Sequence, residues 1–290
     1  MAAVSTKSAI VALRDTEKSA LLTLLGDESP AVYEVVRDKI LSCGADARDW
    51  LRPQTLSSDP LTRRRAQEII RHVDRQAADT TFLAFCLQQN EGFDIEQGAW
   101  LLARTQYPEI NVEAYAALLD QFAGELRQRL EPGMPAHPLL NRINDFLHDQ
   151  LGFIGNHEDY HDPDNSYLNR VLDRRTGNPI NLSLVYLLLA RRLSLPVSGI
   201  GLPGHFVCRY QSASGEVYID PFNRGKLLTK ADCVQYLVQG KYDLRDEYLS
   251  PITPRRMLAR ICGNLHQIYV RLRAADESTR FQRYLVALSR

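Results

Sequence analysis

The sequence predicts an α+β fold, in which a helix-rich first half leads into a core of one central helix and an antiparallel sheet, followed by C-terminal helices. Three observations predict it. Apolar residues recur at helical spacing through the first half, a segment from Thr176 to Pro196 is apolar on every side, and two alternating runs, 205–210 and 215–220, flank a polar turn. A helix without a polar face is usually buried at the centre of its domain.

Composition limits the class of protein. The chain has 290 residues, 44% of them hydrophobic, and its 35 Lys and Arg residues balance its 35 Asp and Glu residues. This length accommodates one large or two modest domains. The zero net charge disfavours general nucleic-acid binding, because such proteins usually carry a basic excess. The first residues lack a signal-type apolar run, and the stretch Leu182–Ala190 is too short to span a bilayer. We therefore expect a cytoplasmic protein that binds neither nucleic acid nor membrane.

The possible metal ligands do not form a recognisable site. The cysteines are scattered without a Cys-x-x-Cys pair, at Cys43, Cys86, Cys208, Cys233 and Cys262. Neither a disulfide framework nor a zinc site is indicated, and we expect small buried side chains. The stretch 157–164 (His-Glu-Asp-Tyr-His-Asp-Pro-Asp) holds several groups able to bind a metal, but its polar, turn-rich sequence indicates a surface loop. No metal and no cofactor is predicted.

Helices account for the first half of the chain. Ser29-Pro30 is a typical helix start, and the helix that follows pairs with residues 20–25 like a single HEAT-type repeat. Asp59-Pro60 opens a helix that runs to about Ala78. We interpret its Arg63-Arg64-Arg65 run as a solvated, salt-bridged face, with phosphate contact as the alternative. Further helices are expected at 82–89, 95–104, 112–130, 255–273 and 277–288.

Two proline-rich breaks divide the chain. They lie at Glu131-Pro-Gly-Met-Pro135 and at 249–254, and both contain residues that end helices. They predict three parts, namely a helical N-terminal region at 1–134, a core at 135–250 and C-terminal helices at 251–290.

The two alternating runs predict a hairpin whose register follows from the hydrophobic pattern. Pairing Tyr210 with Gly215 puts Cys208 and Val217 on one apolar face. A slip by one residue would mix polar and apolar side chains on both faces.

The same register sets Arg209 opposite Glu216 and His205 opposite Asp220. A histidine oriented by a carboxylate is the base-and-orienter half of a nucleophilic triad. A purely structural contact at the end of a strand is the open alternative.

This combination resembles the transglutaminase-like superfamily, which has papain-like ancestry. Its pattern has Gly-x-Cys at the start of a helix, then an arginine and a proline near the helix end, and His-aromatic and Asp-Pro pairs at two strands. The corresponding residues here are Gly177-Asn178-Pro179, Arg191, Pro196, His205-Phe206 and Asp220-Pro221. The resemblance implies a papain-type core within 135–250.

The chain resembles still more closely the SirB-type transglutaminase-like proteins, an uncharacterised bacterial family. The resemblance runs from Gly92 to the end, and its matching segments are 93–103, 165–168, 175–180 and 202–206. In that family the tail, here 256–288, resembles tetratricopeptide-type helices.

Pro179 stands where active relatives carry the nucleophilic cysteine, and proline offers neither a nucleophile nor an N–H. Members of the SirB-type family also read Pro-Ile there, which indicates an inherited loss. Ser183 lies one turn further along and is a substitute nucleophile in principle. A buried serine bonded to a backbone carbonyl is the simpler interpretation. Cys208 is expected on the apolar face, away from His205.

Two asparagines complete the set of candidate site residues. Asn165 and Asn169 are expected to line the groove beside His205, or else to cap the helix that follows Asp164.

Two functions follow from these residues. The first is a non-catalytic protein-interaction or regulatory module with an unknown protein partner, in which His205 and Asp220 are vestigial triad partners. The second is a hydrolase or acyl-transfer enzyme that uses Ser183 or a water activated by His205.

Overall fold

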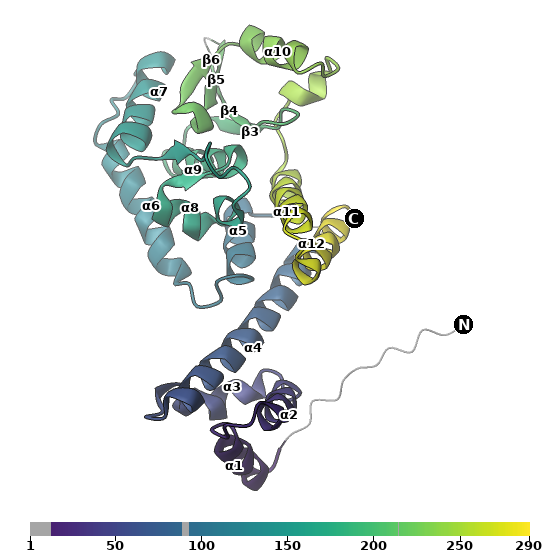
Figure 1. Ribbon diagram of the computed structural model, residues 1–290. Coiled ribbons are helices and arrows are strands. Elements are labelled where there is room, and N and C mark those ends of the chain that lie inside the picture. The colour runs from purple at the N-terminus through teal and green to yellow at the C-terminus, as the bar shows by residue number, and fades with distance from the viewer. Residues whose placement is uncertain (1–12, 89–92, 214) are drawn as a thin grey trace. The chain divides into compact units, whose positions relative to one another are not determined.

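The computed structural model describes residues 13–88, 93–213 and 215–290 and confirms the predicted α+β class, with many helices and small sheets (Figure 1). Among these residues, no helix is both long enough and apolar enough to cross a membrane.

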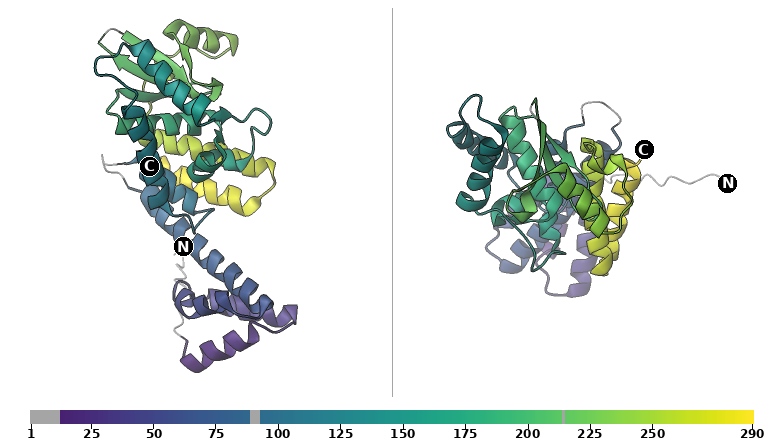
Figure 2. Two further views of the ribbon diagram at one scale, coloured as in Figure 1. Left: turned by 90° about the vertical axis from the view of Figure 1, so that its left-hand side faces the viewer. Right: turned by 90° about the horizontal axis from the view of Figure 1, so that it is seen from above.

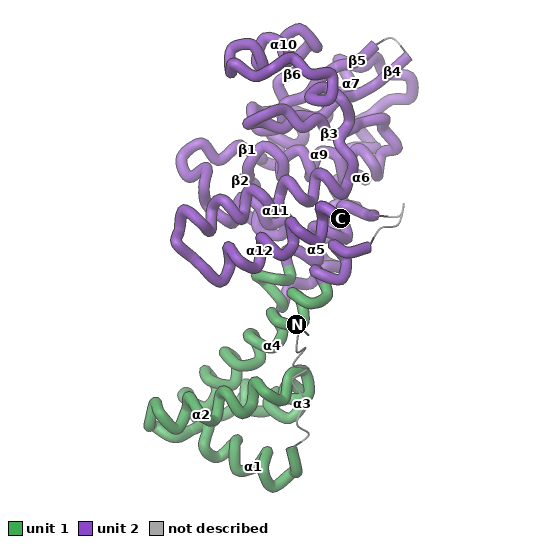
Figure 3. Tube along the Cα trace, turned by 90° about the vertical axis from the view of Figure 1, so that its right-hand side faces the viewer, with its two compact units in different colours: residues 1–81, 104–108 green, residues 82–103, 109–290 purple. Residues whose placement is uncertain are grey.

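The chain divides into two compact units (Figure 3). Residues 1–81 and 104–108 belong to the first unit, and residues 82–103 and 109–290 to the second. The predicted three-part division at 134 and 250 stays a prediction.

The first unit is built from short helices around an apolar core. Its elements are α1 (Asp15–Leu24), α2 (Pro30–Leu41), α3 (Asp46–Leu51), the short helix η1 (Arg52–Leu56) and residues 60–81 of α4 (Pro60–Cys86). Buried side chains from these helices meet in one cluster, which includes Leu25, Val36, Ile40, Leu51 and Ile69.

The arginine run does not form the fully solvated face that the sequence predicts. Arg64 does pair with Glu68, at 3.9 Å, but Arg65 is buried. The Arg65 guanidinium donates to the carbonyl oxygens of Leu25 and Asp27, at 2.8 and 2.5 Å. These carbonyls follow the end of α1, where backbone acceptors lack helical partners, so the arginine satisfies groups that water would otherwise reach.

Helix α4 corrects a second expectation, because the predicted helices 60–78 and 82–89 are one continuous helix, Pro60–Cys86. The segment between them contains no glycine or proline that would end a helix. Thr80 and Thr81 instead donate their hydroxyls to the carbonyls of Gln76 and Ala77, one turn back, so both polar groups are satisfied within the helix.

The second unit contains the central helix and both sheets. Its longer helices are α5 (Ile95–Arg104), α6 (Val112–Arg127), α7 (Ala136–Asn144), α8 (Leu168–Arg174), α9 (Pro179–Arg192), α10 (Lys230–Gln239), α11 (Pro254–Arg271) and α12 (Ala275–Leu288). Its short helical segments are η2 (Asp145–Gln150), η3 (Pro163–Ser166), η4 (Pro221–Asn223) and η5 (Asp246–Leu249). Its strands are β1 (Ile154–Gly155), β2 (Thr176–Gly177), β3 (Val197–Ile200), β4 (Val207–Ser212), β5 (Gly215–Asp220) and β6 (Lys226–Leu228).

The larger sheet is antiparallel, with strand order β3-β4-β5-β6, and helices cover both of its faces (Figures 1 and 2). Val207 and Tyr218 pack with residues of α10, whereas the Cys208 sulfur contacts the backbone of α9. The short strands β1 and β2 form a separate parallel pair, and α11 and α12 pack side by side as a hairpin.

Helix α9 is enclosed as the sequence predicts. Every residue from Pro179 to Ala190 is buried except Leu187, which is partly exposed. The helix packs against α6, α8, α11 and the strands β3 and β4. Because it has no polar side to turn to water, its position is fixed by contacts on all sides.

The predicted hairpin register is wrong by two residues. In the structure Cys208 pairs with Ile219 and Ser212 with Gly215, so the connecting loop has two residues rather than four. Two-residue loops are the commonest hairpin connections. A shift by two keeps every side chain on its original face, which is why the hydrophobic pattern could not distinguish the two registers.

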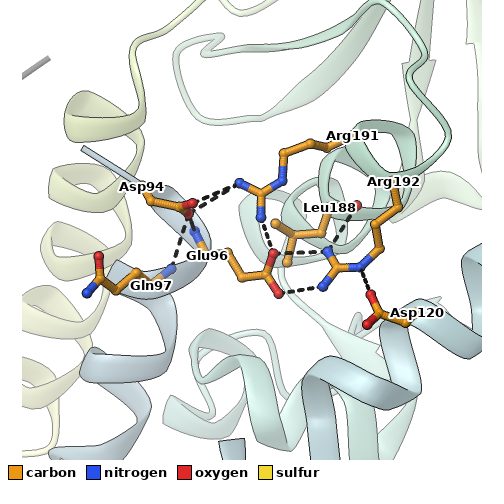
Figure 4. A network of polar contacts seen from close by, with 7 residues as sticks. All are labelled: Asp94, Glu96, Gln97, Asp120, Leu188, Arg191 and Arg192. Carbon is orange, nitrogen blue, oxygen red and sulfur yellow. Dashed lines mark hydrogen bonds and ion pairs between the residues drawn. The ribbon is translucent and has the colours of Figure 1, made fainter. Parts of the chain in front are cut away.

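The charged end of α9 is fixed by a polar network (Figure 4). The Arg192 guanidinium donates to both carboxylate oxygens of Glu96, at 2.8 and 2.9 Å, and to Asp120 at 2.6 Å. Arg191 contacts Glu96 and also Asp94, the latter at 3.2 Å. Because Glu96 is on α5 and Asp120 on α6, this network joins three helices.

We predict that Glu96→Gln lowers the free energy of unfolding by about 2–3 kcal/mol, because it leaves two arginines without their shared charge in a partly dry site. The Glu96 side chain is only 10% exposed, whereas that of Asp120 is 67% exposed. The matched control Asp120→Asn should therefore change stability by less than about 1 kcal/mol. Urea denaturation measures both, and equal effects would contradict the assignment.

Candidate functional site

His205 and Asp220 meet beside the start of α9. The His205 Nε2 lies 2.8 Å from Asp220 Oδ2, and the two side chains are 13% and 7% exposed. The Asn223 side-chain amide donates to the same oxygen at 2.8 Å, and its backbone N–H donates to Oδ1 at 3.2 Å. The imidazole is therefore held through Nε2, and within the described part of the chain its Nδ1 has no hydrogen-bond partner.

These contacts keep Asp220 ionised. Burial alone disfavours the charged carboxylate, but the hydrogen bonds and charge of His205, together with the donors of Asn223, outweigh it and lower the pKa of Asp220. A carboxylate that stays charged is what orients a neighbouring imidazole.

The predicted register required His205 to lie in the strand ladder opposite Asp220. In the structure His205 lies outside the ladder. It ends the turn before β4 (Val207–Ser212), and its side chain reaches Asp220 from there. The turn contains Gly204, whose φ of +72° is a left-handed conformation that favours glycine.

Side chains from the C-terminal part of the chain hold this turn in place. The Arg260 guanidinium of α11 donates to the carbonyl oxygens of Leu202 and His205, at 2.5 and 2.6 Å. Tyr236 of α10 donates its hydroxyl to the carbonyl of Pro203 at 3.1 Å. Helices α10 and α11 thus position the histidine.

Pro179 and His205 line the same pocket, of about 510 Å³, which we name the His205 pocket. Helix α9 contributes Pro179 and Ile180, preceded by the cap residue Asn178, whose Oδ1 accepts from the backbone N–H of Asn181 at 3.0 Å. The position where the family pattern requires a cysteine is therefore beside the imidazole, but it carries no reactive group.

Ser183 and Cys208 lie outside the lining of this pocket. Ser183 is fully buried, and its hydroxyl donates to the carbonyl of Phe206 at 3.5 Å. The Cys208 sulfur lies 3.6 Å from the carbonyl oxygen of Ser183, and burial raises the pKa of its thiol. Neither side chain is placed to attack a molecule bound beside His205.

Asn165 and Asn169 are both buried, and neither is among the residues that line the His205 pocket. The Asn165 amide donates to the carbonyls of Asp159 and Tyr160, at 2.8 and 3.3 Å. Because Tyr160 lines the pocket, Asn165 supports its wall. Within the described residues, Asn169 Oδ1 has no hydrogen-bond partner.

The acidic and histidine-rich stretch 157–164 makes ion pairs and ring contacts. Asp162 pairs with Arg174 at 2.5 Å, and His161 contacts Arg271. In the part of the chain that is described, no three His, Cys, Asp or Glu side chains are grouped so that they could hold a metal ion.

Sequence reasoning missed the polar face that α11 turns to the pocket. Arg260, Asn264, Gln267 and Arg271 all line the His205 pocket. Their spacing of four, three and four residues places them on one side of the helix, away from most of the apolar residues that α11 buries. This periodicity was the available signal.

The comparisons with known proteins identify the class. A family model described as the transglutaminase-like superfamily matches residues 113–263, just over half of the chain. This range contains α9, the His205 turn and Asp220. The chain belongs to the transglutaminase-like superfamily.

The chain is similar to bacterial proteins named UPF0162. It is 35% identical over 201 residues to one from Xylella fastidiosa strain Temecula1, covering 66% of this chain and 70% of the relative. It is 31% identical over 190 residues to one from Pseudomonas aeruginosa, covering 63% and 67%. F-box only protein 21 of Mus musculus is 39% identical over 151 residues, which is 49% of this chain but only 23% of that protein. No solved structure matches the chain.

The lowered pKa of Asp220 predicts a specific acid sensitivity. Because the folded pKa is below the ordinary value of about 3.9, the carboxylate stabilises the fold above that pH, and this contribution is lost as the pH falls through the folded pKa. We expect the free energy of unfolding to fall less steeply between about pH 6 and pH 3 in Asp220→Asn than in the wild type. The surface substitution Asp246→Asn is the matched control and should keep the wild-type slope. Urea denaturation across this pH range would contradict the role of Asp220 if all three slopes coincide.

Proposed function

We propose that this protein is a non-catalytic protein-interaction or regulatory module built on a transglutaminase-like core. The observation that carries the proposal is Pro179, which occupies the helix start beside His205 and lines the same pocket. Acyl transfer by this superfamily's pattern needs a sulfur at that position, and proline cannot replace it.

The surrounding geometry supports binding rather than chemistry. The pocket beside His205 is open and large enough for a ligand, since sites for small molecules usually measure about 300–1,000 Å³. The buried positions of Ser183 and Cys208 offer no replacement nucleophile at its lining.

We also propose a narrower family assignment and a division of the chain into three parts. Within the superfamily we assign it to the SirB-type group, with a helical N-terminal region at 1–134, the core at 135–250 and tetratricopeptide-like helices at 251–290. In this account the protein is cytoplasmic, acts on a protein partner, and binds neither nucleic acid nor membrane. Similarity to F-box only protein 21 covers 23% of that protein, so the same core is one part of a longer chain there, as expected of a module.

A second candidate function is a hydrolase or acyl-transfer enzyme that uses Ser183 or a water activated by His205. The observation in its favour is the His205–Asp220 contact at 2.8 Å. A carboxylate in this position orients a histidine for general base catalysis, a role that a non-catalytic protein does not require. Under the first proposal the same contact holds the turn before β4 against β5.

Labelling with a fluorophosphonate tests the form of the second function that uses Ser183. We expect the native protein to show no labelling above that of the variants Ser183→Ala and His205→Ala, because the Ser183 hydroxyl is buried and bonded to a carbonyl. Mass spectrometry of the tryptic peptide 176–191 locates any adduct. Labelling of Ser183 that is lost in His205→Ala would overturn the non-catalytic proposal.

A further inference from the structure

The His205 pocket has an unbalanced charge. Two arginines, Arg260 and Arg271, line it, and no aspartate or glutamate does. The start of α9 also faces it through Asn178, Pro179 and Ile180, and the N-terminal end of a helix carries a partial positive charge. The pocket is thus a cationic concavity.

Arg260 is the more unusual of these two arginines. Its guanidinium is partly buried, and within the described residues it donates to the carbonyls of Leu202 and His205 and lies 5.5 Å from the centre of the Phe206 ring. Within the described residues it has no carboxylate at ion-pair distance. Buried charges in proteins are normally paired, because an unpaired one loses its hydration without compensation. An anion bound in the pocket would supply the countercharge.

Arg271 is the second arginine at the lining of the pocket. It is exposed, it touches His161, and among the described residues it too has no acidic partner. Arg260 and Arg271 stand at the two ends of the polar face of α11, about 16 Å apart along the helix. Asn264 and Gln267 lie between them and also line the pocket.

We propose that the His205 pocket binds an acidic peptide segment, with aspartate or glutamate carboxylates placed against Arg260 and Arg271. This rests on the proposed function and names the chemical class of the partner. Guanidinium groups bind carboxylates with paired hydrogen bonds. The amides of Asn264 and Gln267 both donate and accept, as a peptide backbone requires.

The size and lining of the pocket favour a peptide over a small anion. A free phosphate would fill only a small part of about 510 Å³ and could not contact both ends of the α11 face. Pro179, Ile180 and Ile268 add apolar side chains to the lining, and these suit the methylene groups of a peptide side chain better than an inorganic ion.

The test is a titration of the full-length, isotope-labelled protein followed by amide resonances. The probes are acetyl-Gly-Glu-Glu-Gly-amide, the uncharged acetyl-Gly-Gln-Gln-Gly-amide and inorganic phosphate. We expect the Glu peptide to shift resonances of residues that line the pocket, and we expect added salt to weaken the binding of this peptide.

The variant Arg271→Gln should bind the Glu peptide roughly fivefold or more weakly, because it loses one charge-assisted contact. Arg256→Gln removes an exposed charge from the same helix outside the pocket, and should bind like the wild type.

Four results would overturn the inference. They are equal binding of the Gln peptide, Glu-peptide binding that survives unchanged in Arg271→Gln, shifts caused by phosphate but by neither peptide, and the absence of any shift. None of these outcomes depends on fluorophosphonate labelling, so the peptide site can fail while the non-catalytic proposal stands, and the reverse also holds.

Discussion

The enclosure of α9 is the constraint on which the second unit depends. Its side chains are apolar on every side, so the sheet, α6, α8 and α11 must all pack around it. Both of its ends are then fixed by polar groups. Asn178 caps the first turn, and the carboxylate of Glu96 binds the two arginines of the last turn. A helix held in this way presents its first turn to the pocket in a defined position.

The histidine turn depends on elements far along the sequence. Asp220 orients the imidazole from β5, while Arg260 holds the backbone of the turn from α11. Helix α11 is therefore part of the site, since it supplies both the support of the turn and one wall of the pocket. The arrangement sets a buried carboxylate against the imidazole, while proline begins α9 at the lining of the same pocket.

Much of this was accessible from sequence, and the failures have physical reasons. The enclosed helix and the face of each strand residue follow from the hydrophobic pattern, which is insensitive to a shift of two residues along a strand. That same insensitivity made the register wrong. The predicted His205–Asp220 contact does form, but His205 reaches Asp220 from the turn before β4 and not from the strand ladder. The buried role of Arg65 and the pocket face of α11 escaped prediction because long cationic side chains look solvated in a sequence, whatever they contact in the fold.

We propose that the site keeps the geometry of a catalytic triad and lacks only the nucleophile, and Pro179→Cys tests this proposal most directly. The pH dependence of alkylation of Cys at position 179 by iodoacetamide, followed by mass spectrometry, gives the pKa of the new thiol. A thiol at a helix start beside an imidazole should titrate well below the ordinary value of about 8.5, and should return toward it when His205→Ala is added. A pKa near the ordinary value that does not respond to His205→Ala would contradict the account.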